Sequence, residues 1–258
     1  MAEPAQSSRA PDPTHYPVSE KVPEQLVNRE IADTLKRLVE RRLAERGQKA
    51  RVGSDQFIYW VQYAPTRTVA PDLYVLPGVA PDTVITAWKV WETGVVPSLA
   101  VEVVGLDVRK DYELAPGRYD ELGVQELIVY DPRSHESPER VRFQVWRRRR
   151  GSLVRALWSD ADRVRSAVLG CFLREVGQGA SLRLRVATGR HGELLLPTAE
   201  EAEEAERAAR DAAERGRDAA ERGRDAAERE RSAERAARDA AEKELARLRA
   251  ELDELRKR

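Results

Sequence analysis

Residues 97–132 read PSLAVEVVGLDVRKDYELAPGRYDELGVQELIVYDP, and this stretch decides how the chain folds. An apolar strand over 99–104 is followed by a charged turn, a helical segment over 111–122 and a second apolar strand over 125–130. We expect Pro116-Gly117 to interrupt that helix. Strands at both ends of a helix require a crossover, which implies at least one parallel strand pair. The order therefore predicts an α/β fold with a mixed sheet flanked by helices.

Patterns on either side of this stretch extend the prediction. Apolar residues at helical spacing predict a helix over about 23–46, ended by Gly47. A closing hairpin is predicted over 182–186 and 193–196. Further strands are predicted over 56–63, 73–76, 140–147 and 153–158, and 84–91 is either another strand or an irregular insert.

Composition divides the chain into three parts. Residues 1–18 are rich in Pro, Ala and Ser, which predicts a disordered tail. All five tryptophans precede residue 160, so the packed domain is expected within 19–197. Residues 198–258 contain no Pro, aromatic residue, Val or Ile, and RDAAERG occurs twice in tandem from Arg210. This last part is predicted to form a long charged helix.

The long helix has two possible states. Leu245, Leu248, Leu252 and Leu255 occupy a and d positions of a heptad, which favours a coiled coil that makes a homodimer or higher oligomer. The alternative is a solitary helix stabilised by Glu–Arg pairs, each contributing about 0.2–0.5 kcal/mol. In the earlier heptads only alanines are available, and Gly216 and Gly223 weaken the helix.

Several functional classes find no support in the sequence. Positive and negative residues number 45 each, so no overall basic charge indicates nucleic acid. The single cysteine, Cys171, lies in an apolar run and is expected in the core. The three histidines are far apart, and no nucleophile elbow or phosphate-binding glycine loop is present. Without a signal peptide or a membrane-spanning stretch, we expect a cytoplasmic protein and no membrane partner.

Carboxylates are the remaining candidates for chemistry. Asp72 stands at the start of one short strand and Glu102 in the middle of another, where burial is costly unless a partner compensates. Two such acids facing one pocket could hold Mg²⁺ or Mn²⁺, which suits phosphate chemistry. The alternative is that Glu102 points to solvent from one face of its strand.

A cation is needed to stabilise the negative charge that develops on a phosphate. Arg109 and Lys110 follow the Glu102 strand, and Arg118 lies on the next helix. Each of them could also be an ordinary surface charge. The tract Arg147–Arg150 could contact a phosphate backbone or simply form a solvated hairpin tip.

The chain resembles the Uma2 family of restriction endonuclease-like proteins over roughly residues 20–197. The resemblance is carried by Pro71-Asp72, Val101-Glu102-Val103, Asp111, Tyr119, Gly123-Val124-Gln125-Glu126 and Tyr130-Asp131-Pro132. It implies the PD-(D/E)xK nuclease fold and a Mg²⁺-dependent phosphodiesterase that acts on DNA. It also implies that Asp72 and Glu102 are catalytic metal ligands.

The sequence departs from the family pattern at its lysines. Val104 stands two residues after Glu102, where the nuclease motif has lysine, and Ala115 stands where many Uma2 members have one. Lys110 or Arg118 is therefore expected to supply the catalytic cation. If neither can, the domain is a catalytically inactive scaffold whose helical tail recruits a partner, or the tail itself defines the function.

Overall fold

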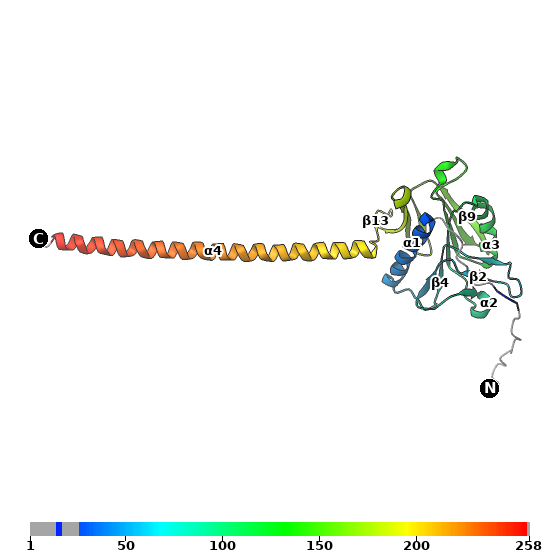
Figure 1. Ribbon diagram of the computed structural model, residues 1–258, viewed down its shortest axis with the longest axis horizontal. Coiled ribbons are helices and arrows are strands. Elements are labelled where there is room, and N and C mark those ends of the chain that lie inside the picture. Colours follow the sequence, from blue (N-terminus) through cyan, green and yellow to red (C-terminus); the bar gives the residue numbers. More distant parts are fainter. Residues whose placement is uncertain (1–13, 17–25, 257–258) are drawn as a thin grey trace, which may run out of the picture. The chain divides into compact units, whose positions relative to one another are not determined.

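A computed structural model describes residues 14–16 and 26–256. The chain divides into two compact units, Met1–Thr198 and Ala199–Arg258 (Figure 1). Most of the predicted disordered tail, residues 1–18, lies outside the described residues. Tyr16 is described, and its ring packs edge-on against Tyr59 with centroids 5.0 Å apart.

A six-stranded mixed sheet organises the first unit. Its order is β1-β4-β6-β7-β8-β9, in which β6 and β7 are parallel and every other neighbouring pair is antiparallel. The parallel pair confirms the predicted crossover. The strands are β1 (Ala50–Gly53), β4 (Leu73–Pro77), β6 (Leu99–Val103), β7 (Glu126–Tyr130), β8 (Phe143–Arg149) and β9 (Ser152–Ser159).

Separate apolar clusters cover the two faces of this sheet. On one face, Leu99 and Val101 of β6 pack with helix α1 (Leu26–Glu45). On the other face, Ala100 and Val104 pack with Tyr119 of helix α3 (Ala115–Leu122). Figure 1 shows α1 and α3 on opposite sides of the sheet. All five residues of β6 are buried, as expected for a strand covered on both faces.

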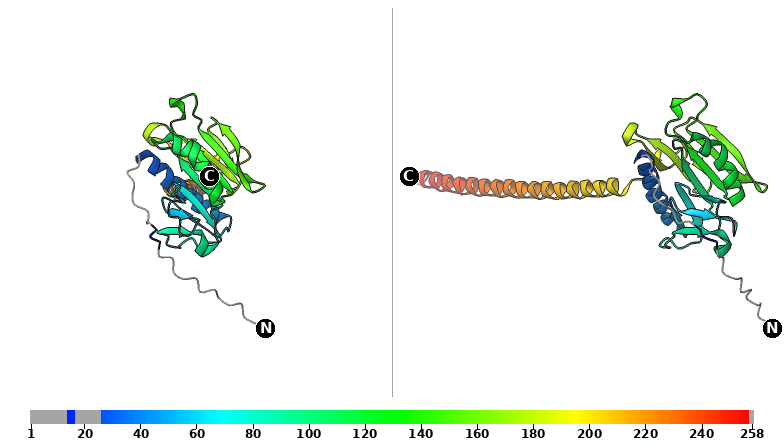
Figure 2. Two further views of the ribbon diagram at one scale, coloured as in Figure 1. Left: turned by 90° about the vertical axis from the view of Figure 1, so that its right-hand side faces the viewer. Right: turned by 45° about the vertical axis from the view of Figure 1, so that its right-hand side comes forward.

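Two smaller sheets complete the unit (Figure 2). The predicted closing hairpin is present, but it belongs to a four-stranded sheet with two strands that were not predicted. That sheet consists of β10 (Arg163–Ser166), β11 (Cys171–Val176), β12 (Arg183–Thr188) and β13 (Leu194–Leu195). The other sheet contains β3 (Thr68–Val69), β2 (Phe57–Tyr59) and β5 (Ala87–Lys89). Cys171 is buried in the core, as predicted.

The crossover differs from its prediction. A five-residue π-helix, η1 (Lys110–Leu114), runs directly into α3, so the helix is not interrupted at Pro116-Gly117. Pro116 follows the wider π-helical turn of η1, so the helix continues through a residue that donates no backbone hydrogen bond. Gly123 ends α3 in the left-handed region with φ 96°.

One strand prediction was too long, and the segment left open between a strand and an irregular insert contains both a strand and a helix. The strand predicted over 56–63 ends at Tyr59, and Tyr63 has a left-handed φ of 65°. Over 84–91 only β5 is extended, and the short helix α2 (Val90–Thr93) follows it at once. Aromatic and β-branched composition cannot separate three-residue strands from the turns beside them.

The second unit is one helix, α4 (Ala199–Arg256), of 58 residues. It confirms the predicted long helix and passes through Gly216 and Gly223 without a break. Leu245, Leu248 and Leu252 are 51%, 54% and 51% exposed. Within the described residues 14–16 and 26–256, no helix has the length and apolar character needed to cross a membrane.

Candidate functional site

The sheet register brings the two predicted acids together. Leu73 of β4 pairs with Val101 of β6 in an antiparallel register, so the next pair outward is Asp72 with Glu102. Both side chains lie on the α3 face, because Leu73 and Val101 belong to the α1 face. The two carboxyl groups are in hydrogen-bonding contact. The structure therefore joins the two acids that the sequence separates by thirty positions.

Short hydrogen bonds hold each acid in place. The backbone N–H of Val103 donates to Asp72 Oδ2 at 2.6 Å. The Tyr119 hydroxyl donates to Glu102 Oε1 at 2.5 Å. Glu102 is only 5% exposed, so it does not point to solvent. Tyr119 is fully buried, and its hydroxyl fixes the orientation of the Glu102 carboxylate.

The environment of Glu102 disfavours its charged form. Burial is the largest cause, Lys110 acts in the opposite direction, and Asp111 adds a second carboxylate nearby. Together these raise the pKa of Glu102 to about 7. A cation placed between Asp72 and Glu102 would favour the charged form.

Lys110 is the cation that the structure places beside the acids. It is the first residue of η1, and its Nζ lies 3.8 Å from Asp111 Oδ1. Partial burial lowers the pKa of Lys110, but the carboxylates of Glu102, Asp111 and Asp72 outweigh this and raise it. The ammonium group is thus charged, and Glu102 and Asp72 are among the acids that favour its charged form.

Arg118 occupies a different position. It lies on α3 one residue before Tyr119, which turns it about 100° away from the face that covers Glu102. Its side chain is exposed. The structure therefore brings Asp72, Glu102 and Lys110 together and leaves Arg118 on the surface of α3.

The two family lysine positions are apolar and buried. Val104 lies on the same face as Glu102 and is 0% exposed, and Ala115 is 5% exposed. Both pack with Tyr119 in one apolar cluster. Lys110 lies between these two positions in the sequence, at the start of η1.

Tyr119 and Asp111 are site residues whose contacts could not be derived from sequence pattern. Asp111 is 4% exposed and accepts a hydrogen bond from the Gly105 N–H at 3.1 Å. Burial is the main reason that its pKa is raised. An acid at the start of a helical segment and a tyrosine on the apolar face of the same segment are weak signals, because both are common in structural roles.

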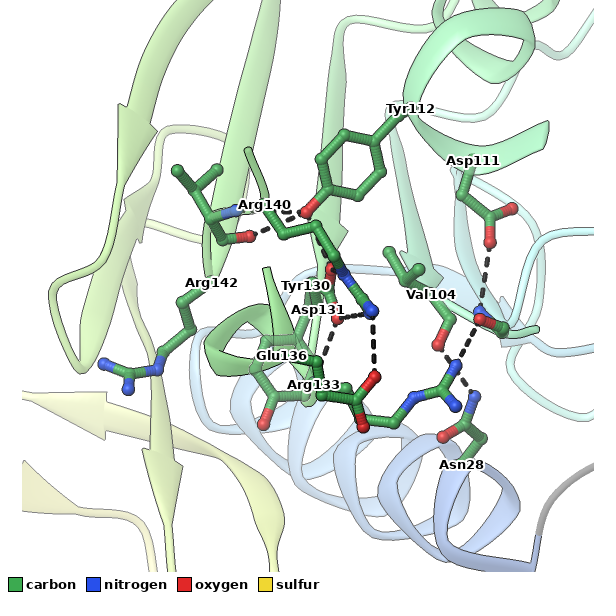
Figure 3. A network of polar contacts seen from close by, with 12 residues as sticks. Asn28, Val104, Asp111, Tyr112, Tyr130, Asp131, Arg133, Glu136, Arg140 and Arg142 are labelled. Carbon is green, nitrogen blue, oxygen red and sulfur yellow. Dashed lines mark hydrogen bonds and ion pairs between the residues drawn. The ribbon is translucent and has the colours of Figure 1, made fainter. Parts of the chain in front are cut away.

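A polar network braces the chain beyond the site (Figure 3). Asp131, at the end of β7, accepts hydrogen bonds from Arg140 Nε and Nη2 at 2.7 and 2.6 Å and from the Tyr112 hydroxyl at 2.7 Å. Arg133 Nη2 donates to the Gly105 carbonyl at 2.5 Å. The turn after Glu102 is thereby tied to the end of β7.

The arginine tract is largely engaged in the fold. Arg147 Nε pairs with Glu126 at 2.9 Å and Arg148 Nη1 with Asp120 at 3.0 Å. The strand continues through Arg149, and Arg150 and Gly151 form the turn with φ 51° and 93°. Only Arg149 and Arg150 remain exposed.

The donor set fits a hard divalent cation. Within the described residues, no group of three or more His, Cys, Asp or Glu side chains is arranged to share a metal ion. Magnesium commonly uses one or two carboxylates and keeps several waters, so Asp72 and Glu102 are sufficient protein ligands. The carboxyl groups of Asp72 and Glu102 touch, and the pKa of Glu102 is raised. A divalent cation between them would favour the charged form of both groups.

Comparison with known proteins identifies the family of the chain. The family model of Uma2, described as "Putative restriction endonuclease", matches residues 18–169. A solved structure described as "a putative nuclease belonging to DUF820" from Anabaena variabilis ATCC 29413 is similar, with 12% identity and a TM-score of 0.36. The similarity covers 57% of this chain and 75% of that one. No curated protein matches the sequence.

Proposed function

Since the chain belongs to the Uma2 family, we propose that it is a cytoplasmic, metal-dependent endonuclease that hydrolyses phosphodiester bonds in DNA. One observation carries the proposal: the side chains of Asp72 and Glu102 are in contact, and the charged Lys110 interacts electrostatically with both while its Nζ lies 3.8 Å from Asp111 Oδ1. Asp72 and Glu102 would hold Mg²⁺ or Mn²⁺, which when bound supplies Lewis-acid activation of the phosphate and of a water molecule.

The side chains have distinct roles in this proposal. Lys110 stabilises the negative charge on the phosphate oxygens, because its ammonium group is partly exposed and already surrounded by acids. Glu102 accepts a proton from the attacking water, because a bound cation would hold its carboxyl group in the charged form that can act as a base. Tyr119 orients Glu102, and Arg118 is left to contact the DNA backbone from the surface of α3.

The decisive experiment is a cleavage assay on supercoiled and linear DNA over several divalent metals. Asp72→Ala and Glu102→Gln are expected to abolish metal-dependent cleavage, because each removes a charged ligand. An Asp72→Ala protein that cuts as fast as the wild type would refute the proposal. Circular dichroism confirms that each variant is folded.

Lys110 has a matched control in its neighbour. Lys110→Met is expected to lower the cleavage rate by about 10²–10³-fold, because it removes a group that stabilises charge in the transition state. Arg109→Met should leave the rate almost unchanged, since Arg109 is exposed and pairs with Glu113 at 3.0 Å. Equal rates for Lys110→Met and the wild type would assign the cation to another residue.

A second function rests on a specific observation. Both usual lysine positions are filled by buried apolar residues, Val104 and Ala115. In this alternative the domain is a catalytically inactive scaffold and α4 recruits a partner. Metal binding without cleavage of DNA or RNA by the full chain would favour it, and Lys110-dependent cleavage would exclude it.

A further inference from the structure

Strands β8 and β9 continue the row of residues that contains the two acids. Glu102 pairs with Val129, Val129 with Gln144, and Gln144 with Trp158. Residues paired in this way share one face of the sheet, so Gln144 lies on the face of Glu102. Two strand spacings, about 10 Å, separate their backbones. This distance is comparable to the span of one or two nucleotides along a single strand.

Polar atoms without partners gather on this part of β8. Gln144 is 1% exposed, and neither its amide nitrogen nor its amide oxygen has a hydrogen-bond partner within the described part of the chain. The indole N–H of Trp146, two residues along on the same face, is also buried and unpaired. Unpaired buried polar groups destabilise a fold. We therefore interpret the two Gln144 amide atoms and the Trp146 indole nitrogen as partners for a polar group of a ligand.

A bulge in β9 sets the positions of two exposed side chains next to these atoms. Ala156 is the extra residue, so Arg155 and Trp158, three positions apart, face Trp146 and Gln144 respectively. The Arg155 guanidinium lies 4.7 Å from the Trp158 ring centroid and 5.8 Å from that of Trp146. Trp158 is 42% exposed on the edge strand. Among the described residues, Arg155 has no carboxylate partner.

We propose that Gln144, Trp146, Arg155 and Trp158 form a subsite for one unstacked nucleotide of a single-stranded nucleic-acid segment. Trp158 stacks on the base, which every nucleobase permits. Arg155 neutralises the adjacent phosphate. The Gln144 amide offers a donor and an acceptor to the base edge when the Trp158 ring leaves its edge-on contact with Tyr112, in which the ring centroids are 5.9 Å apart. The substrate class rests on the proposed function, and the subsite places the flanking nucleotide beside Asp72 and Glu102.

The test measures binding without cleavage. The full chain is titrated into a fluorescein-labelled single-stranded DNA of about 12 nucleotides, a length that spans one binding site, in EDTA. Trp158→Ala is expected to weaken binding about tenfold through the loss of one stacked base. Leu157→Ala is the matched control, because Leu157 is similarly exposed at 41% but pairs with Val145 of the opposite face. It should bind as the wild type does. An RNA oligonucleotide and a DNA duplex are titrated separately. The duplex should bind more weakly than the single-stranded DNA.

Gln144→Met supplies a second, independent readout. Removing unpaired polar atoms should raise the thermal midpoint of the free protein, whereas loss of the base contact should weaken oligonucleotide binding. A residue with a purely structural role would not produce both effects. Wild-type affinity in both Trp158→Ala and Gln144→Met, or no binding of single strands by the wild type, overturns the subsite.

The outcomes separate this inference from the nuclease proposal. Single-strand binding that depends on Trp158, in a protein that cuts nothing with any metal, would refute the nuclease and keep the subsite. If the wild type cleaves DNA and the Trp158→Ala variant has the same KM, the nuclease proposal stands and the subsite is refuted.

Discussion

Glu102 shows at the residue scale how a site can be kept at the expense of stability. Its carboxyl group lies in the centre of an apolar strand, in contact with Asp72 and the Tyr119 hydroxyl. Burial is the main cause that raises its pKa to about 7. An acid whose pKa is raised by folding stabilises the fold while it is protonated and loses that contribution as it ionises.

This raised pKa makes a prediction about stability and pH. Without metal, the free energy of unfolding should fall by roughly 3 kcal/mol as the pH rises from below 4.5 to above 7, because ionised Glu102 is favoured in the unfolded chain. Glu102→Gln should have a flatter profile over that range. Urea titrations at pH 4.5, 6, 7 and 8 measure the difference, and parallel profiles would contradict it. Mg²⁺ should stabilise the wild type more at pH 8 than at pH 5.

At the scale of elements, the crossover owes its position to contacts at both ends. The π-helix η1 turns Lys110 and Asp111 toward the acids, and π-helical turns are often found at functional sites. Beyond it, Tyr112 donates to Asp131, which links the crossover to the end of β7. The site therefore depends on a buried ion pair that takes no part in the chemistry.

Asp131→Asn tests this link. Asp131 is 1% exposed and Arg140 only 11%, so removing the carboxylate leaves a nearly buried guanidinium with the half-exposed Glu136 as its remaining counter-charge. We expect a loss of about 3–5 kcal/mol in the free energy of unfolding. Glu121→Gln is the control, because its pair with Arg67 is more than half exposed and should contribute about 0–1 kcal/mol. Equal losses in urea unfolding would show that the network does not brace the fold.

The glycines of α4 give a second prediction for an element. An added Cβ at Gly216 or Gly223 meets no atom within 4 Å. Replacing both with alanine should stabilise the helix by about 1 kcal/mol each through helix propensity. Thermal melting of residues 199–258, followed by circular dichroism, measures the gain. An unchanged melting curve would mean that association, and not propensity, limits the helix.

At the scale of the whole molecule, each of the two units is stabilised by a different kind of interaction. The first has a buried core on both faces of its sheet, whereas the side chains described in α4 are almost all exposed. A solitary helix of this composition depends on i to i+4 pairs such as Arg210–Glu206. Three half-exposed leucines at heptad spacing offer α4 a further source of stability in a second copy.

This contrast predicts how the full chain and a chain ending at Thr198 behave. The shorter chain should keep its thermal midpoint within about 2 °C, because the division between the units leaves its core intact. We expect the full chain to sediment as a dimer or larger oligomer and the shorter one as a monomer. Leu245→Gln with Leu252→Gln should return the full chain to a monomer. A monomeric full chain would establish the solitary helix.

Local patterns were sufficient for the features that repeat or alternate along the chain. The period of α1 and α4 and the apolar runs of β6 and β7 follow from residues close in sequence, so these elements were predicted. The pairing of Asp72 with Glu102 was one of two interpretations of the sequence, because an acid within a buried strand needs a partner or an exposed face. Two- and three-residue strands such as β3 and β5 were missed or misjudged, since so few residues carry no period.

Other features depend on contacts between segments far apart in sequence. Which cation faces Glu102 follows from the path of the crossover, and the sequence favoured Lys110 over Arg118 without excluding either. In the sequence, Gln144 is one polar residue of an alternating strand. Only the register of four strands shows that it lies in the same row as Glu102. Its burial and its unpaired amide atoms also appear only in the tertiary structure. Side-chain alternation is a property of one strand, whereas burial and neighbours are set by how strands pair.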